Sequence, residues 1–128
     1  MAMSLSANVI TKNFVMEDMT FNAVTTTSKS CEIFFPIDDC KGEFDLVLDN
    51  SKSASAALNL IVNGGVGPAA MKDTVYTVPA GSVCRISFAT GQVMNAGGLF
   101  KGKLTSTDSL ATMNVRVAVI KRRYVTNH

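Results

Sequence analysis

Few residues of this chain have the types and the spacing that catalysis or metal binding requires. The single histidine, His128, is the last residue, so a Ser-His-Asp or Cys-His arrangement would have to use a chain end. The cysteines Cys31, Cys40 and Cys84 lie nine and forty-four residues apart, which does not match a zinc knuckle. We therefore expect no catalytic residue, no bound metal and no cofactor, and we expect that the protein is not an enzyme.

The cysteines leave two interpretations open. An odd number in a chain that is not dense in cysteine suits a reducing compartment. Cys31 and Cys40 could form a disulfide if the strand geometry allowed it, but three small apolar side chains are the favoured interpretation. Because Cys84 alternates with Ile86 and Phe88, we expect it in the core, where it would be alkylated slowly in the folded protein.

Carboxylates gather in one part of the chain, at Asp38, Asp39, Glu43, Asp45 and Asp49. Oxygen ligands this close could hold Ca²⁺, but the spaced acidic loop of an EF-hand is absent. A glycosidase pair would need a cleft, and the chain has no tryptophan to stack on a sugar. The pattern therefore predicts a solvated acidic face. Across a subunit contact it would balance the basic residues Lys101, Lys103, Arg116, Lys121 and Arg122.

Two further segments resemble nucleotide or nucleic-acid sites only superficially. The glycine-rich segment 64–67 lacks the Gly-Lys-Ser/Thr ending of a P-loop, and Pro68 follows it with no clear helix, so a plain turn is favoured. The basic run 121–123 belongs to a chain with a net charge of +2 and favours a solvated tail. No secretion signal and no apolar run of about 20 residues is present. We expect no nucleic-acid and no membrane partner.

The elements that hold these residues are predicted to be strands, because apolar and polar residues alternate with a period of two. In Glu43–Asn50 the side chains of Phe44, Leu46 and Leu48 would point inward. We expect Ala56–Asn63 to return as the antiparallel neighbour of this strand, with a short helix over 53–61 as the alternative. Further strands are predicted at 9–16, 21–27, 31–37, 74–78, 83–88, 100–105 and 113–120.

This spacing of short strands predicts an all-β fold, either an antiparallel β-sandwich or a jelly roll of about seven to nine strands. We expect residues 1–8 to form a flexible N-terminal arm and residues 9–128 to form one β-sandwich domain. Apolar residues also occur on the strand faces opposite the predicted core. Such residues indicate an oligomer interface or a doubly covered sheet, and they are Phe34, Val47, Ile61, Ala118 and Ile120.

In four segments the chain resembles the small β-sandwich virion proteins of tailed bacteriophages, the head decoration or cement proteins. The segments are Phe35-Pro36-Ile37, Gly42–Leu48, Thr77–Gly81 and the closing strand Val115–Arg122. The resemblance implies a non-enzymatic structural protein that assembles on a capsid, often as a homotrimer, with the major capsid protein as its partner. It also implies synthesis in the host cytoplasm and a final location on the virion surface.

Two other functions remain open. A carbohydrate- or ligand-binding β-sandwich module would place its site in the loops Gly64–Asp73 and Thr90–Gly98, although the low aromatic content counts against a sugar platform. A tail or baseplate structural protein would share the same composition and fold as a capsid decoration protein.

Overall fold

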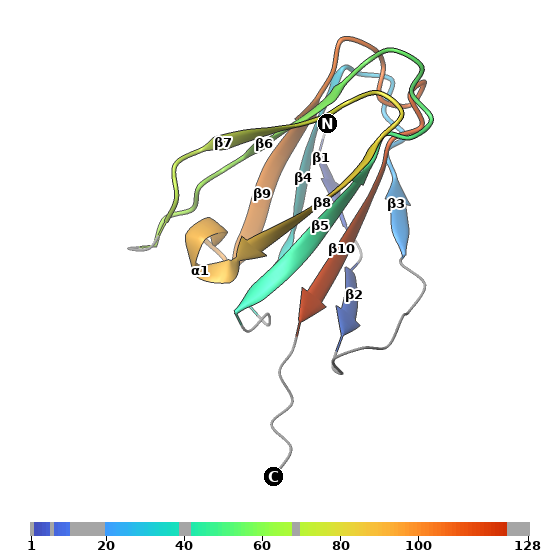
Figure 1. Ribbon diagram of the computed structural model, residues 1–128. Coiled ribbons are helices and arrows are strands. Elements are labelled where there is room, and N and C mark those ends of the chain that lie inside the picture. Colours follow the sequence, from blue (N-terminus) through green and yellow to red (C-terminus); the bar gives the residue numbers. More distant parts are fainter. Residues whose placement is uncertain (1, 6, 11–19, 39–41, 68–69, 123–128) are drawn as a thin grey trace.

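The structure, a computed structural model, describes residues 2–5, 7–10, 20–38, 42–67 and 70–122. Their strands form two sheets that face each other across one apolar core, and a single short helix lies at the open end of the sandwich (Figure 1). The predicted all-β sandwich class is confirmed. Within the described residues, no helix is both long and apolar enough to cross a membrane.

The first sheet, called sheet I, has the strand order β1-β4-β9-β6-β7. Its only parallel pair is β1 with β4, and its other neighbours run antiparallel. Its strands are β1 (Ala2–Ser4), β4 (Ser30–Pro36), β9 (Leu99–Thr105), β6 (Leu58–Val62) and β7 (Thr74–Val78).

The second sheet, called sheet II, has the order β2-β10-β5-β8, and β3 also pairs with β10. Here β2 runs parallel to β10, whereas β3, β5 and β8 join antiparallel ladders. Its strands are β2 (Ala7–Ile10), β3 (Phe21–Ala23), β5 (Glu43–Asp49), β8 (Val83–Ala89) and β10 (Arg116–Arg122).

Alternation along the strands builds the core as predicted. Phe35 and Phe100 of sheet I stack with ring centroids 4.9 Å apart, and Phe44 and Phe88 of sheet II stack at 5.5 Å. Edge-to-face contact between Phe35 and Phe44 joins the two sheets. Such aromatic pairs add about 0.5–1.5 kcal/mol beyond the burial of their area.

The predicted pairing of Glu43–Asn50 with Ala56–Asn63 is wrong. The segment after β5 crosses to the other sheet, so that β6 pairs with β7 and β9 while β5 pairs with β8 and β10. The buried Asn50 holds this crossing, because its side-chain amide donates to the carbonyls of Ala56 and Val78 at 3.1 and 3.2 Å. The alternative helix over 53–61 is also wrong, since β6 occupies Leu58–Val62.

The N-terminal segment differs from the flexible arm expected for residues 1–8. Ala2–Ser4 form β1 at the edge of sheet I, and the Leu5 side chain is buried against the core. Residues 7–10 form β2 beside β10. Because most of residues 1–8 are small or polar, they show no clear alternation of the kind that predicts a strand. Most of the strand predicted at 9–16 lies outside the described residues.

Candidate functional site

The outward face of sheet I carries apolar side chains among charged ones. On this face Glu32 stands opposite Lys103, and Phe34 stands opposite Lys101. Ile61 lies on the other side of Lys103 in the next strand. Successive side chains of a strand point to opposite faces. These side chains therefore point outward, because their neighbours along each strand are buried in the core. We call this surface the binding face.

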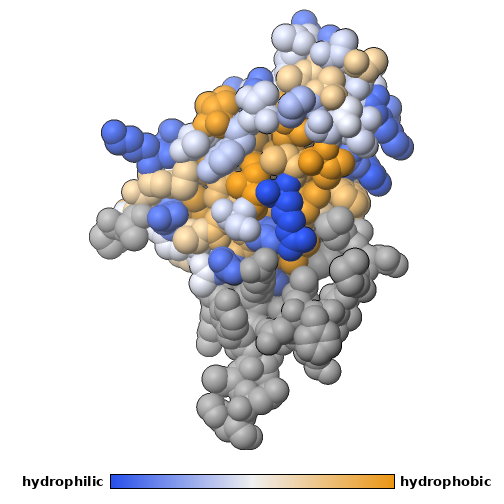
Figure 2. All heavy atoms as spheres, in the orientation of Figure 1, coloured by the Kyte–Doolittle hydropathy of each residue, from blue (hydrophilic) through white to orange (hydrophobic). Residues whose placement is uncertain are grey.

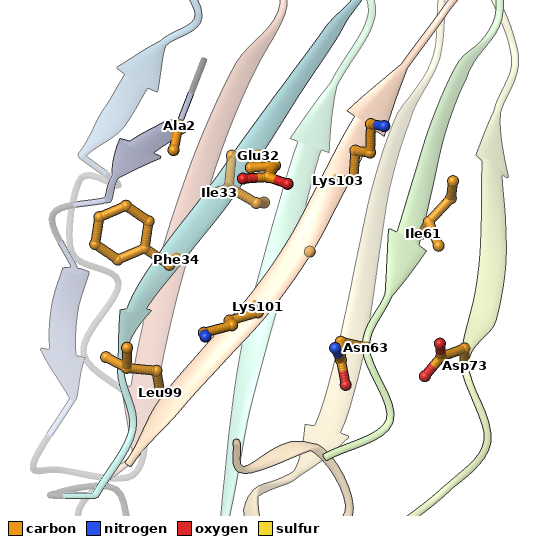
Figure 3. A pocket seen from close by; sticks show the side chains of 11 residues that line it. Ala2, Glu32, Ile33, Phe34, Ile61, Asn63, Asp73, Leu99, Lys101 and Lys103 are labelled. Carbon is orange, nitrogen blue, oxygen red and sulfur yellow. The ribbon is translucent and has the colours of Figure 1, made fainter. Parts of the chain in front are cut away.

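A pocket of about 560 Å³ lies open on the binding face (Figure 3). Phe34, Ile61 and Leu99 are half-buried and supply its apolar lining. Lys101 projects between Phe34 and Leu99 in the same view. Half-exposed apolar side chains gathered on one sheet face are typical of a contact surface rather than of a solvated face.

Charges of both signs lie among these apolar side chains. Lys101 and Lys103 come from β9, Glu32 comes from β4, and Asp73 lies just before β7. The Asp73 carboxylate accepts a hydrogen bond from the Gly64 backbone N–H at 2.8 Å, which fixes the loop at this rim. The face thus mixes half-buried apolar side chains with charges of both signs, and protein–protein interfaces likewise combine apolar contact area with polar groups.

The five predicted interface residues divide between the two sheets. Phe34 and Ile61 both line the pocket on the binding face. Val47, Ala118 and Ile120 instead form a small cluster on the outward face of sheet II, where each is at most 3% exposed and Phe21 packs against them. These side chains are buried within the single chain.

The predicted solvated acidic face is wrong at its two central residues. Asp45 and Asp49 point outward from β5, but their side chains are only 0% and 5% exposed. Arg85 contacts the Asp45 carboxylate at 2.6 Å, and Arg116 contacts Asp49 at 2.5 Å. Arg116 was expected to balance these acids across a subunit contact, whereas it does so within the chain.

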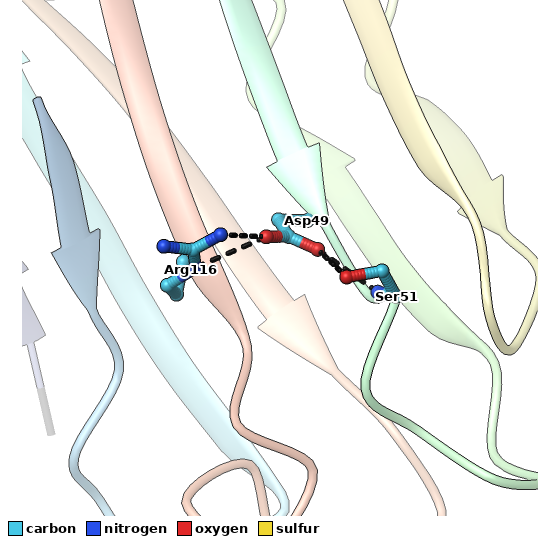
Figure 4. A network of polar contacts seen from close by, with 3 residues as sticks. All are labelled: Asp49, Ser51 and Arg116. Atoms are coloured by element: carbon cyan, nitrogen blue, oxygen red, sulfur yellow. Dashed lines mark hydrogen bonds and ion pairs between the residues drawn. The ribbon is translucent and has the colours of Figure 1, made fainter. Parts of the chain in front are cut away.

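Asp49 is held by partners on both carboxylate oxygens (Figure 4). Ser51 donates its hydroxyl and its backbone N–H to one oxygen at 2.5 and 2.9 Å, and Arg116 binds the other. Burial alone would raise the pKa of Asp49, but the Ser51 hydrogen bonds and the Arg116 charge outweigh it and lower the pKa. Because both of its carboxylate oxygens are bonded within the chain, Asp49 has a structural role rather than that of an open metal ligand.

Figure 2 looks onto the side of the molecule where β5, β8 and β10 lie, and hydrophilic side chains cross an otherwise apolar surface there. Arg116 lies over the Phe21 ring at 4.3 Å, which adds a cation–π contact to its ion pair. Lys121, expected in a solvated basic tail, is buried at 5% exposure. In β10 it lies opposite Phe44 of β5, so its side chain points toward the inner side of the sheet.

Cysteine and carboxylate chemistry is not concentrated anywhere in the described part of the chain. No group of three or more His, Cys, Asp or Glu residues there is placed to hold a metal ion. Cys31 is a free, buried thiol whose pKa is raised by burial. Cys84 is free and half-buried against the core. The suggested partner of Cys31, Cys40, lies outside the described residues.

The two loops expected to form a ligand site do meet. Val66 donates its backbone N–H to the Met94 carbonyl, and Met71 donates to the Gln92 carbonyl, at 3.1 and 3.0 Å. The second loop contains the short helix α1 (Thr90–Val93), which the sequence did not predict. Because these backbone groups satisfy one another, the contact stiffens the open end of the sandwich.

The binding face was only partly predictable. Alternation around Phe100 and Leu104 placed Lys101 and Lys103 on the outer side of their strand. No local signal showed that β4 and β6 flank β9, and Leu99, Asn63 and Asp73 were therefore missed. Only knowledge of the strand order would have brought them together with Phe34.

No family model and no curated protein sequence matches the chain. Among solved structures, the chain is similar to the pre-peptidase C-terminal domain of a collagenase from Bacillus anthracis. The two share 14% sequence identity and a TM-score of 0.46, over 89% of this chain and 94% of that one.

Proposed function

We propose that this chain is a non-enzymatic structural protein of a phage particle that binds the outer surface of the capsid and stabilises it. The observation that carries the proposal is the binding face, where Phe34, Ile61 and Leu99 remain half-buried in an open pocket that also holds charged side chains of both signs. The sequence resemblance to head decoration proteins supplies the partner, the major capsid protein.

The chemistry of the face suits a repeated protein lattice. Its apolar side chains provide contact area, and Lys101 and Lys103 with Glu32 and Asp73 give charges of both signs that fix orientation. A single face of this size provides modest affinity, and many copies bound to one shell add up to a stabilising layer. Neither step requires a catalytic group.

Co-sedimentation tests the proposal. Empty heads of the phage that encodes the chain, stripped of decoration, are mixed with wild-type protein or with the Lys101→Glu variant. We expect wild-type protein to pellet in a fixed ratio to the capsid protein. Lys101→Glu should bind about tenfold more weakly or worse, the scale of a contact worth more than about 1.4 kcal/mol.

Lys52→Glu is the matched control, because it makes the same charge reversal at an exposed turn after β5, away from the binding face. It should pellet like wild type. Wild-type protein that stays in the supernatant at every concentration contradicts the capsid proposal. Equal losses in Lys101→Glu and Lys52→Glu would show that overall charge, and not the binding face, determines attachment.

A ligand-binding module is the second candidate, and the pocket itself favours it. Phe34 offers a ring at one side of the pocket, while Asn63 and Asp73 offer polar groups at the other side, and ligand sites combine apolar side chains with a few polar groups in this way. A glycan array distinguishes the two functions: specific hits that are lost in Phe34→Ala would support the module, and an array without hits would remove its carbohydrate form.

A further inference from the structure

Strand β8 forms an open edge of sheet II. It pairs with β5 on one side, and no described strand lies on its other side. It is seven residues long, and Val83 at its beginning is 56% exposed. An edge strand presents a row of unpaired backbone N–H and C=O groups, which is a template for pairing with another chain.

Two hydrogen bonds that extend the β5–β8 ladder show which backbone groups point to that open side. Asn50 donates to the Ser82 carbonyl at 3.0 Å, and Thr90 donates to the Gly42 carbonyl at 2.9 Å. Both pairs continue the β5–β8 register. Bonded and non-bonded pairs alternate in an antiparallel ladder.

It follows that the even-numbered residues of β8 bond to β5. The odd-numbered residues direct their N–H and C=O groups away from the sheet, and they are Val83, Arg85, Ser87 and Ala89.

The usual protection of an edge is missing here. β8 contains no proline and no lysine, and its one charged side chain, Arg85, is held over the sheet by Asp45. Cys84 and Ile86 point toward the core but remain half-buried. At this edge, therefore, backbone groups of β8 have no described strand to pair with, and two apolar side chains are incompletely buried.

We propose that β8 pairs antiparallel with β8 of a second copy of this chain, about a two-fold axis at Ile86, so that two copies of sheet II join into one continuous sheet. In this register Val83 lies opposite Ala89 of the second copy, and Arg85 lies opposite Ser87 of the second copy. All outward-directed N–H and C=O groups of β8 then find partners.

Other registers are poorer. An axis at Arg85 places two arginines directly opposite each other, which is destabilising. An axis at Ser87 leaves Val83 opposite Gly91, which already belongs to α1. A register shifted by one residue places bonding groups opposite non-bonding ones. The Ile86 axis alone pairs the full strand without a like-charge contact.

The pairing gives a dimer, rather than the trimer that the phage resemblance implies. It does not depend on the proposed function. A two-fold axis normal to the joined sheet leaves both copies of sheet I on the same side, so two binding faces would point in the same direction.

Disulfide trapping tests the register. Residues that pair without hydrogen bonds have Cα atoms about 4.5 Å apart, within the range of about 4.4–6.8 Å that a disulfide spans. In a background where Cys31, Cys40 and Cys84 are replaced by alanine, Ile86→Cys should form a covalent dimer on mild oxidation. Ser87→Cys is the matched control and should stay unlinked, because its neighbour is Arg85 of the second copy.

Light scattering after size exclusion provides a test that leaves the cysteines intact. Wild type should have twice the chain mass of 13.6 kDa. Val83→Pro removes one outward N–H without touching the ladder to β5, and it should be monomeric at concentrations where wild type is a dimer.

Val75→Pro is the matched control on the edge of the other sheet. Val75 is 59% exposed. Asn63 donates to the Lys101 carbonyl in the β6–β9 register, so the odd-numbered residues of β6 bond to β9 and the even-numbered ones bond to β7. In the β6–β7 register even-numbered residues pair with even-numbered residues. The N–H of the odd-numbered Val75 therefore points outward from β7. This variant should stay dimeric. A monomeric wild type, a dimeric Val83→Pro, or a disulfide in Ser87→Cys but not in Ile86→Cys overturns the proposal.

Discussion

Asp49 stands on the outward side of a sheet, yet its side chain is 5% exposed and bonded at both oxygens. A buried carboxylate is costly unless partners compensate it. Ser51 supplies neutral donors from the adjacent turn, whereas Arg116 supplies a charge from a strand 67 residues away in the sequence. The residue therefore joins β5 to β10 by side chains in addition to the backbone ladder.

Asp49→Asn should lower the free energy of unfolding by about 1–3 kcal/mol, the range for hydrogen bonds to charged groups and for leaving such a group unsatisfied. The Arg116 side chain is 40% exposed, so water limits the loss. Asp108→Asn, at an exposed position, is the control and should change stability little. Urea unfolding at neutral pH measures both variants.

The same carboxylate predicts a pH dependence. The pKa of Asp49 is lowered in the folded chain, so its stabilising contribution is complete above the unfolded-state pKa of about 3.9 and is lost as the pH falls through the lower folded value. The stability difference between wild type and Asp49→Asn should thus shrink in strong acid. A difference that stays constant from neutral pH to strong acid would contradict this role.

At the scale of elements, the loop between β6 and β7 depends on a close backbone approach at Gly64. A Cβ placed there would lie 1.8 Å from the Met71 carbonyl oxygen, whereas one at Gly91 in α1 would meet nothing within 4 Å. Gly64→Ala should therefore destabilise the protein by about 1–3 kcal/mol.

Gly91→Ala is the matched control for that substitution, and it should be neutral or stabilising by up to about 1 kcal/mol. Thermal unfolding followed by circular dichroism measures the pair. Equal effects of the two substitutions would show that the loop shifts to make room at Gly64.

Strand identity was predictable because alternation is a local property. The inward sets Phe44-Leu46-Leu48 and Ile33-Phe35 follow from a period of two. Strand neighbours were not predictable in the same way. Sequential strands often pair, and this tendency wrongly joined β5 to β6, although the Asn50 side chain holds the chain where it crosses between sheets.

The environment of outward-facing residues was the least predictable feature. Asp45 has the pattern of a solvated residue, but it is a buried carboxylate paired with the half-exposed Arg85, 40 residues away in the sequence. Conversely, Phe34 and Ile61 were singled out as apolar residues on the outer side of a strand, and the strand order places both at one pocket. Burial on an outer face depends on distant strands, which alternation does not specify.

At the scale of the whole molecule, the binding face and the β8 edge belong to different sheets. The face lies on the outside of sheet I, and the edge closes sheet II. The two proposed contacts therefore do not compete for the same residues. In the two proposals the chain pairs through sheet II and attaches to a surface through sheet I.

This division predicts avidity. When two binding faces point in the same direction, attachment of the first brings the second to the shell at high effective concentration, which can raise affinity by about 10²–10⁴-fold. Val83→Pro, which keeps Phe34 and Lys101 intact, should therefore bind capsids at least about 10²-fold more weakly than wild type, as measured by sedimentation isotherms. Lys52→Glu, which lies away from both the binding face and β8, should bind like wild type. If Val83→Pro is monomeric and still binds with wild-type affinity, each face acts alone, and pairing through β8 contributes nothing to attachment.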